Sequence, residues 1–148
     1  MATTNQSLEN ELKGYPQTVE VTLTAAQIIA MYTTPVLVVP AVSNKAIIVE
    51  STELIITRTS TAFTGGGVVS VQYNSTANGA GTSVQASTIA ATVITGAAGT
   101  TYSTRTPATL SDVATASIKG IGLYISNATA VFAAGTGTAI VRVVYRTI

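Results

Sequence analysis

The sequence predicts an all-β fold, a jelly-roll-like β-sandwich with one short helix and a polar N-terminal arm. Three observations predict it: short segments alternate apolar and polar residues with a period of two, glycine-rich stretches connect them, and a single segment has helical spacing. The 148 residues suit one domain, so we expect an arm at residues 1–17 and one sandwich at residues 18–148. An immunoglobulin-like sandwich is the nearest alternative, although the Cys and Trp residues that mark it are absent.

The arm is expected at residues 1–17 because Asn, Gln, Ser, Glu and Lys dominate this segment, and Gly14 and Pro16 end it. One short helical turn at residues 7–13, with Ser7 as its N-cap, is the alternative. The first residues lack a basic start followed by an apolar run, so a secretory signal is not expected. In either form, the segment lacks a face that a core would bury.

A strand, a helix and a second strand follow the arm. Residues 19–23 are expected to form the first strand, because valine and leucine alternate there with glutamate and threonine. Thr24 then caps a predicted two-turn helix at residues 25–31. Two prolines flank the apolar residues 36–39. Since proline lacks the N–H that a ladder needs, we expect a short or peripheral strand there.

Residues 45–59 form the longest predicted strand, and its apolar positions change sides partway along. Those up to Val49 have one parity and those from Leu54 onward have the other. A β-bulge or bend near residues 51–52 reconciles the two halves, as happens where a strand passes from one sheet to the other. We therefore expect an irregular strand at this place.

The next segments are a turn, a strand and a weakly patterned middle. Glycines 65–67 permit a turn before the alternating residues 69–73, which predicts a hairpin with the preceding long strand. Residues 74–116 consist mainly of Ser, Thr, Ala and Gly. Within them, weaker strands are expected at residues 84–90 and 92–94.

The C-terminal third again alternates clearly, at residues 121–125 and 141–145. These two strands pair as a hairpin or lie as neighbours across the sandwich, and the pattern leaves both possibilities open. The first and last strands are both strongly patterned, so we expect them to lie beside each other.

The composition disfavours most kinds of chemistry. The chain contains no His, Cys or Trp, and 47% of it is hydrophobic while only 9% is charged. The net charge is +1 and the seven basic residues are scattered along the sequence, so we expect no nucleic-acid partner. Mean hydropathy is +0.46, yet no run of about 18 apolar residues occurs, so no membrane span is expected. We expect no cofactor, no metal and no enzymatic activity.

The acidic residues are the only candidates for catalysis or metal binding. Glu50 and Glu53 are a close carboxylate pair, and paired carboxylates serve as acid and base in sugar hydrolysis. Residues three apart on a regular strand lie on opposite faces, so the pair converges only if a bulge intervenes. Asp112 is the sole aspartate, which disfavours a calcium loop. We interpret the two glutamates as solvated or subunit-bridging residues, with Lys45 or Arg58 as partners.

Surface contacts are the chemistry that the strands offer. Arg142 and Arg146 share one parity on the last strand, where they face solvent or pair with phosphate, a partner's carboxylates or a neighbouring strand's glutamate. Apolar residues of the 36–39 strand are expected at a subunit interface. The residues predicted to contact a subunit or another protein are Glu50, Glu53, Arg58, Arg142, Arg146, Val36 and Val38.

Four segments carry a resemblance to a known class of proteins. They are VEVTLTAAQIIAMYTTPV at residues 19–36, KAIIVES at 45–51, TAFTGGG at 61–67 and GTAIVRVVYRTI at 137–148. Together they resemble small β-rich virion structural proteins of tailed bacteriophages, most closely the capsid decoration (cement) proteins. The polar arm departs from that compact pattern.

The resemblance implies a non-enzymatic protein on the outer surface of a phage capsid, made in the host cytoplasm. It implies the major capsid protein as partner and a homotrimer as the assembled form. A receptor- or glycan-binding domain of a head spike or tail fibre is the alternative, and an enzyme acting on a surface polymer is a third hypothesis.

Overall fold

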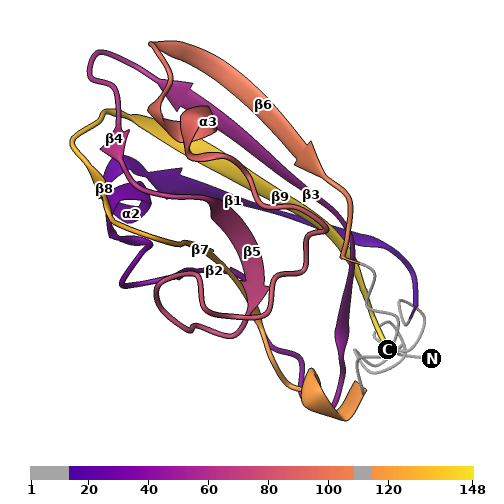
Figure 1. The fold of residues 1–148 in the computed structure, drawn as a ribbon. Helices are drawn as coiled ribbons and strands as arrows, with labels where there is room; N and C mark the ends of the chain where they lie inside the picture. Colours follow the sequence, from indigo (N-terminus) through magenta and orange to yellow (C-terminus); the bar gives the residue numbers. More distant parts are fainter. Residues whose placement is uncertain (1–13, 109–114) are drawn as a thin grey trace.

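The computed structural model describes residues 14–108 and 115–148, which form three antiparallel sheets (Figure 1). The all-β class is therefore confirmed. The largest sheet contains, in spatial order, β1 (Gln17–Thr24), β9 (Gly137–Thr147), β3 (Ile47–Arg58) and β6 (Gly99–Arg105). A second sheet contains β2 (Val36–Val39), β7 (Leu123–Asn127) and β5 (Val69–Tyr73), and the third is the short pair β4 (Thr64–Gly65) and β8 (Phe132–Ala133).

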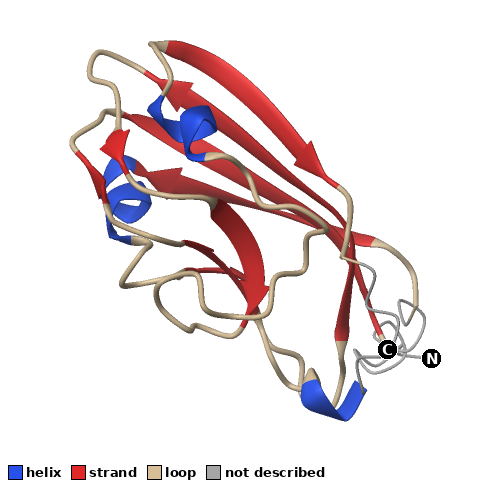
Figure 2. Cartoon of the chain, viewed as in Figure 1, coloured by secondary structure: helices blue, strands red, loops and turns tan. Residues whose placement is uncertain are grey.

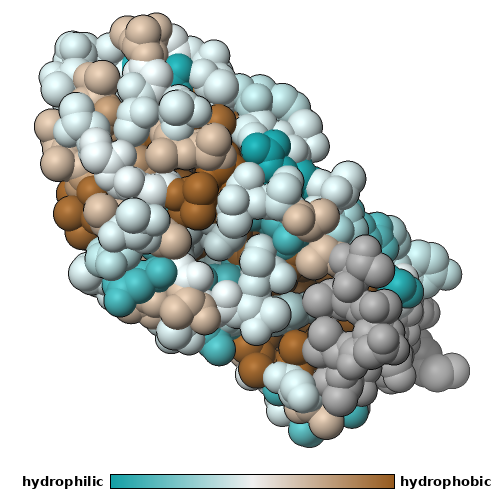
Figure 3. All heavy atoms as spheres, in the orientation of Figure 1, coloured by the Kyte–Doolittle hydropathy of each residue, from teal (hydrophilic) through white to brown (hydrophobic). Residues whose placement is uncertain are grey.

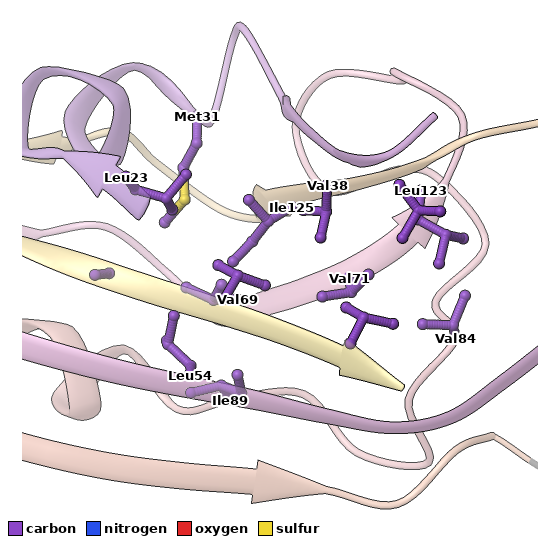
Figure 4. Packing of buried hydrophobic residues seen from close by; sticks show 14 of the residues in the cluster. Leu23, Met31, Val38, Leu54, Val69, Val71, Val84, Ile89, Leu123 and Ile125 are labelled. Atoms are coloured by element: carbon purple, nitrogen blue, oxygen red, sulfur yellow. The ribbon is translucent and has the colours of Figure 1, made fainter. Parts of the chain in front are cut away.

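The four-stranded and three-stranded sheets pack against each other, and the core lies between them (Figure 4). Leu23 and Leu54 contribute to it from the large sheet, and Val71 and Ile125 from the smaller one. Burial of alternate side chains on both inner faces is the main stabilising contribution of such a core. The hydroxyl of Tyr73 adds a polar link, because it donates a hydrogen bond of 2.6 Å to the backbone oxygen of Ile47 in the opposite sheet.

The strand pairings are nested along the chain. β1 pairs with β9, β2 with β7 and β3 with β6, all antiparallel. The chain segment after β5 lies along the edge of β5 that does not pair with β7. There Val69 and Ile89 exchange two backbone hydrogen bonds of 2.8 Å. The predicted neighbourhood of the first and last strands is confirmed.

The predicted irregularity in the longest strand is also confirmed. The register of β3 against β9 shifts between Val49 and Ser51, so one extra residue is accommodated there. On the inner face, burial changes from Ile47 and Val49 to Thr52 and Leu54 across this bulge. The strand stays within one sheet throughout, so the bulge restores the apolar face without moving the chain to the other layer.

Two predictions about strand pairing are settled by the sheet memberships. The hairpin predicted between residues 45–59 and 69–73 is wrong, because β3 and β5 lie in different sheets. The glycine-rich link between them instead contributes β4, which pairs with β8. For the C-terminal third, β7 and β9 belong to different layers, so they are not a hairpin.

The described residues contain two short α-helices and a 3-10 turn (Figure 2). Helix α2 (Ala25–Ala30) is the predicted one, and Thr24 caps it in a reciprocal capping box with Gln27. Helix α3 (Ala91–Thr95) overturns the expectation of a single helix, since a strand was predicted at residues 92–94. The 3-10 turn is η1 (Thr115–Ser117), and residues 84–90 make only isolated bridges instead of the predicted strand.

The predicted arm overlaps the first strand at its end, because β1 already begins at Gln17. Residues 1–13 and Asp112 lie outside the described residues. The chain enters the fold beside its own C-terminus, where the backbone N–H of Gly14 donates to the oxygen of Thr147 at 3.3 Å.

Candidate functional site

The outer face of the four-stranded sheet is the candidate site, because five of the nine charged side chains that the structure describes gather on it. Side chains alternate along a strand, so each residue pointing into the core is followed by one pointing out. On β1 the outward positions are exposed at Thr18, Glu20, Thr22 and Thr24. Figure 1 shows the smaller sheet and both α-helices on the opposite side of this sheet, so the face is uncovered in the part of the chain that the structure describes.

A row of side chains crosses this face. The ladders place Arg142 of β9 directly between Glu20 of β1 and Glu53 of β3, and Thr104 of β6 lies opposite Glu53. The guanidinium of Arg142 binds both carboxylates, donating through Nη1 to Glu53 Oε2 at 2.7 Å and through Nε to Glu20 Oε1. Opposite charges directly across strands stabilise a sheet locally, and one arginine here orders two glutamates. The result is a fixed row with a net charge of one negative unit.

Tyr102 extends the row toward the edge of the sheet. Its side chain is 53% exposed on β6, and its hydroxyl approaches the Glu53 carboxylate. Hydrogen bonding to Glu53 raises the pKa of Tyr102 above the ordinary value of 10.0, and the negative charge of Glu53 acts in the same direction. The hydrogen bonds to Glu20 and Glu53 likewise raise the pKa of Arg142. Both pKa values are therefore moved further above neutral pH, where Tyr102 is neutral and Arg142 is charged.

A second ion pair lies further along the same face. Glu50 points outward by alternation with the buried Val49, and the bulge in β3 leaves Glu53 on the same face. Oε1 of Glu50 lies 3.6 Å from Nε of Arg146. Both side chains are about half exposed, so the pair is screened by water and adds little stability. Lys45 and Arg58, the partners suggested for Glu50 and Glu53, are therefore wrong. The prediction that Arg142 and Arg146 pair with a glutamate of a neighbouring strand is confirmed.

The structure places the seven predicted contact residues in two environments. Glu50, Glu53, Arg142 and Arg146 share the outer face just described. The remaining three lie elsewhere: Arg58, Val36 and Val38.

Two of these three have roles within the chain. Val38 is 2% exposed and packs in the core, so its side chain has no surface to offer a partner. Arg58 is 7% exposed, and its donors reach Val93 O, Ala97 O and Thr101 Oγ1, each at 2.6 Å. Val36, on edge strand β2, is partly buried against the core.

Two members of the site were missed from the sequence. Glu20 alternates with the inward residues of β1, so it faces outward. Together with the predicted neighbourhood of the first and last strands, this alternation could have identified Arg142 as its partner. Tyr102 had no comparable signal, because its strand lies in the weakly patterned middle of the chain.

The site is suited to binding by complementary charge and hydrogen bonding over a broad sheet face. The carboxylates on it are already paired with arginines, so they do not form a vacant acidic cluster. Within residues 14–108 and 115–148, no group of three or more acidic side chains has the arrangement of a metal site. Among the same residues, no helix has the length and apolar character to cross a membrane.

Comparisons of this chain with protein families, with curated proteins and with solved structures gave no match.

Proposed function

We propose that this chain is a non-enzymatic structural component of a tailed-bacteriophage particle, a capsid decoration (cement) protein on the outer surface of the head. Its partners are the major capsid protein and further copies of itself, in a homotrimer. This proposal joins the resemblance of the four sequence segments to an uncovered, charged sheet face.

The outer face of the large sheet is the observation that carries the proposal. It spans four hydrogen-bonded strands, and Arg142 holds Glu20 and Glu53 in fixed positions on it. Pre-ordered charges lose little conformational freedom on binding and select a partner surface of complementary charge. A contact of this kind is weak for each copy, and joining copies in an oligomer raises its effective concentration on a repetitive shell.

We also propose that the two main sheets are a jelly-roll-like sandwich with one reduced strand. A jelly roll is a long antiparallel hairpin of strand pairs rolled into two sheets. The nested pairs β1–β9, β2–β7 and β3–β6 support this assignment. The fourth pair is then β5 with the segment after it, where bridges at Ser83 and Ile89 stand in for a regular strand.

A shell-binding experiment tests the function. The purified protein is mixed with emptied heads of the encoding phage that lack it, and the heads are sedimented. We expect the wild type to sediment with the heads. Arg142→Glu is expected to weaken this binding by a factor of about ten or more, because it changes the charge of the row by two units.

Lys119→Glu is the matched control, since it makes the same charge change at an exposed position away from this face. Circular dichroism checks that both variants fold. A wild type that stays in the supernatant contradicts the proposal, and saturable binding to host cells instead favours the receptor-binding alternative.

A further inference from the structure

Charged residues are scattered along the sequence but segregated in space. Three long segments contain no Asp, Glu, Lys or Arg: residues 21–44, 59–104 and 120–141. Arg58, which borders the second of them, is buried and hydrogen-bonded inside the chain. These segments supply most of the described residues at one end of the molecule.

That end is built around the pair β4–β8. The backbone N–H of Gly66 donates to Val131 O and that of Ala128 to Val68 O, each at 2.9 Å. Helix α2 packs against β8 and α3 against β4, which brings all three uncharged segments together. The opposite end holds Lys45 and the C-terminus, where the backbone N–H of Ala46 donates to Ile148 O at 2.9 Å. We call residues 59–68 and 128–136 the uncharged end.

The uncharged end exposes apolar side chains. Val68 is 40% and Val131 47% exposed, and Ala130, Ala133 and Ala134 beside them are also exposed. Figure 3 shows brown, hydrophobic atoms gathered over the β4–β8 end of the molecule. No ionisable side chain reaches the surface in residues 59–68 or 128–136.

Hydrogen bonds hold the loops of this end in place. Thr136 Oγ1 accepts from the backbone N–H groups of Ser60 and Thr61 at 3.1 and 2.9 Å, which ties the loop before β4 to the loop after β8. Asn127 Nδ2 donates to Ala130 O at 2.6 Å and so supports the turn that presents Val131. A surface ordered in advance loses less entropy on association.

We infer that the uncharged end is the surface through which copies of this chain associate with one another. The cores of protein interfaces are depleted of charged residues, and burying an unpaired charge is costly. Identical copies that meet at this end bring no like charges together, and an uncharged surface has no charge pattern with which to select a charged partner. The inference moves the subunit contact from the strand of Val36 and Val38 to β4 and β8. It rests on the homotrimer of the proposed function and names the contact within it: a wild type of one chain would remove both, whereas an associated Val131→Glu variant would remove this contact alone.

Light scattering on the isolated protein at micromolar concentrations tests the inference. We expect the wild type to have a mass of several chains, and both Val131→Glu and Val68→Glu to have the mass of one chain at the same concentration. Each substitution places a carboxylate in the contact, and the valine that it replaces is about half exposed and lies outside the buried core. Circular dichroism confirms folding of each variant.

Leu37→Glu is the matched control, because Leu37 is 43% exposed on β2, where the contact was first expected. We expect this variant to keep the wild-type mass. A wild type with the mass of one chain overturns the inference, and so does a Val131→Glu variant that stays associated. Dissociation of Leu37→Glu alone returns the contact to β2. If Val131→Glu stays associated but no longer sediments with phage heads, the shell occupies this end.

Discussion

At the scale of single residues, Tyr73 joins the two sheets through one hydrogen bond. Its hydroxyl is buried and donates to Ile47 O, and burial raises its pKa to about 12 from the ordinary 10.0. The unfolded chain therefore loses this proton at lower pH than the folded one. The stabilisation is fully present below pH 10 and is lost as the pH rises through 12.

Tyr73→Phe tests this linkage. At pH 8 we expect it to lower the free energy of unfolding by about 1 kcal/mol, the usual value of one internal hydrogen bond. Above pH 10 the free energy of unfolding of the wild type falls by about 1.4 kcal/mol per pH unit relative to that of the variant, so the two become equal at about pH 11. Urea unfolding across this range measures both, and Tyr15→Phe, at a residue 64% exposed, is the control. A constant difference at every pH contradicts the prediction.

Arg58 is the second residue with a structural role that one substitution exposes. Its guanidinium binds the carbonyl of Val93, in the last turn of α3, and that of Ala97, just beyond the end of the helix. We expect Arg58→Met to lower the free energy of unfolding by about 3 kcal/mol, because buried carbonyls lose charged donors. Arg58→Lys restores only part, since one ammonium cannot span three acceptors. Denaturant unfolding measures both, and a loss below about 0.5 kcal/mol contradicts the role.

At the scale of elements, the bulge in β3 decides which side chains reach the core. Deleting Glu50 removes the extra residue and turns Ile47 and Val49 away from the inner face. We expect the deletion to cost about 3–6 kcal/mol, from exposing two β-branched side chains. Glu50→Thr keeps the bulge and is expected to stay within about 0.5 kcal/mol of the wild type. A stable deletion variant in thermal unfolding would show that the register adjusts elsewhere.

The same strand shows how much of the fold the sequence predicts. Alternation located β1 and β9, and the change of parity located the bulge within one or two residues. Pairing was harder, because a hairpin and a crossover between sheets have the same local alternation. Glycines 65–67 were compatible with both, and packing of the two layers decided for the crossover.

Helix α3 shows the opposite limit. Its residues are mostly β-branched and no side chain caps it, so local propensity favours a strand there. The helix is held by Arg58, which lies 35 residues before Val93 in the sequence. Such a distant contact leaves no local pattern, and this is why the weakly patterned middle of the chain was misassigned.

At the scale of the whole molecule, the candidate site was predictable in part. Shared parity grouped Arg142 with Arg146, but the partners of Glu50 and Glu53 depended on the register across three strands. The three charge-free segments of the uncharged end are visible in the sequence, but no pattern in it shows that they meet. The uncharged end emerges only when distant segments meet around β4 and β8, so it is a property of the tertiary fold.

The two proposed surfaces differ in chemistry, so they differ in their response to salt. Contacts through the row of Glu20, Arg142 and Glu53 weaken as ions screen them, and the screening length falls to about 3 Å at 1 M salt. Self-association through the uncharged end is apolar, so sodium chloride leaves it unchanged and sulfate strengthens it. We therefore expect sedimentation with phage heads to fall between about 0.05 and 0.5 M sodium chloride while the scattering mass stays constant. An oligomer that dissociates over this range would place charged side chains in the subunit contact.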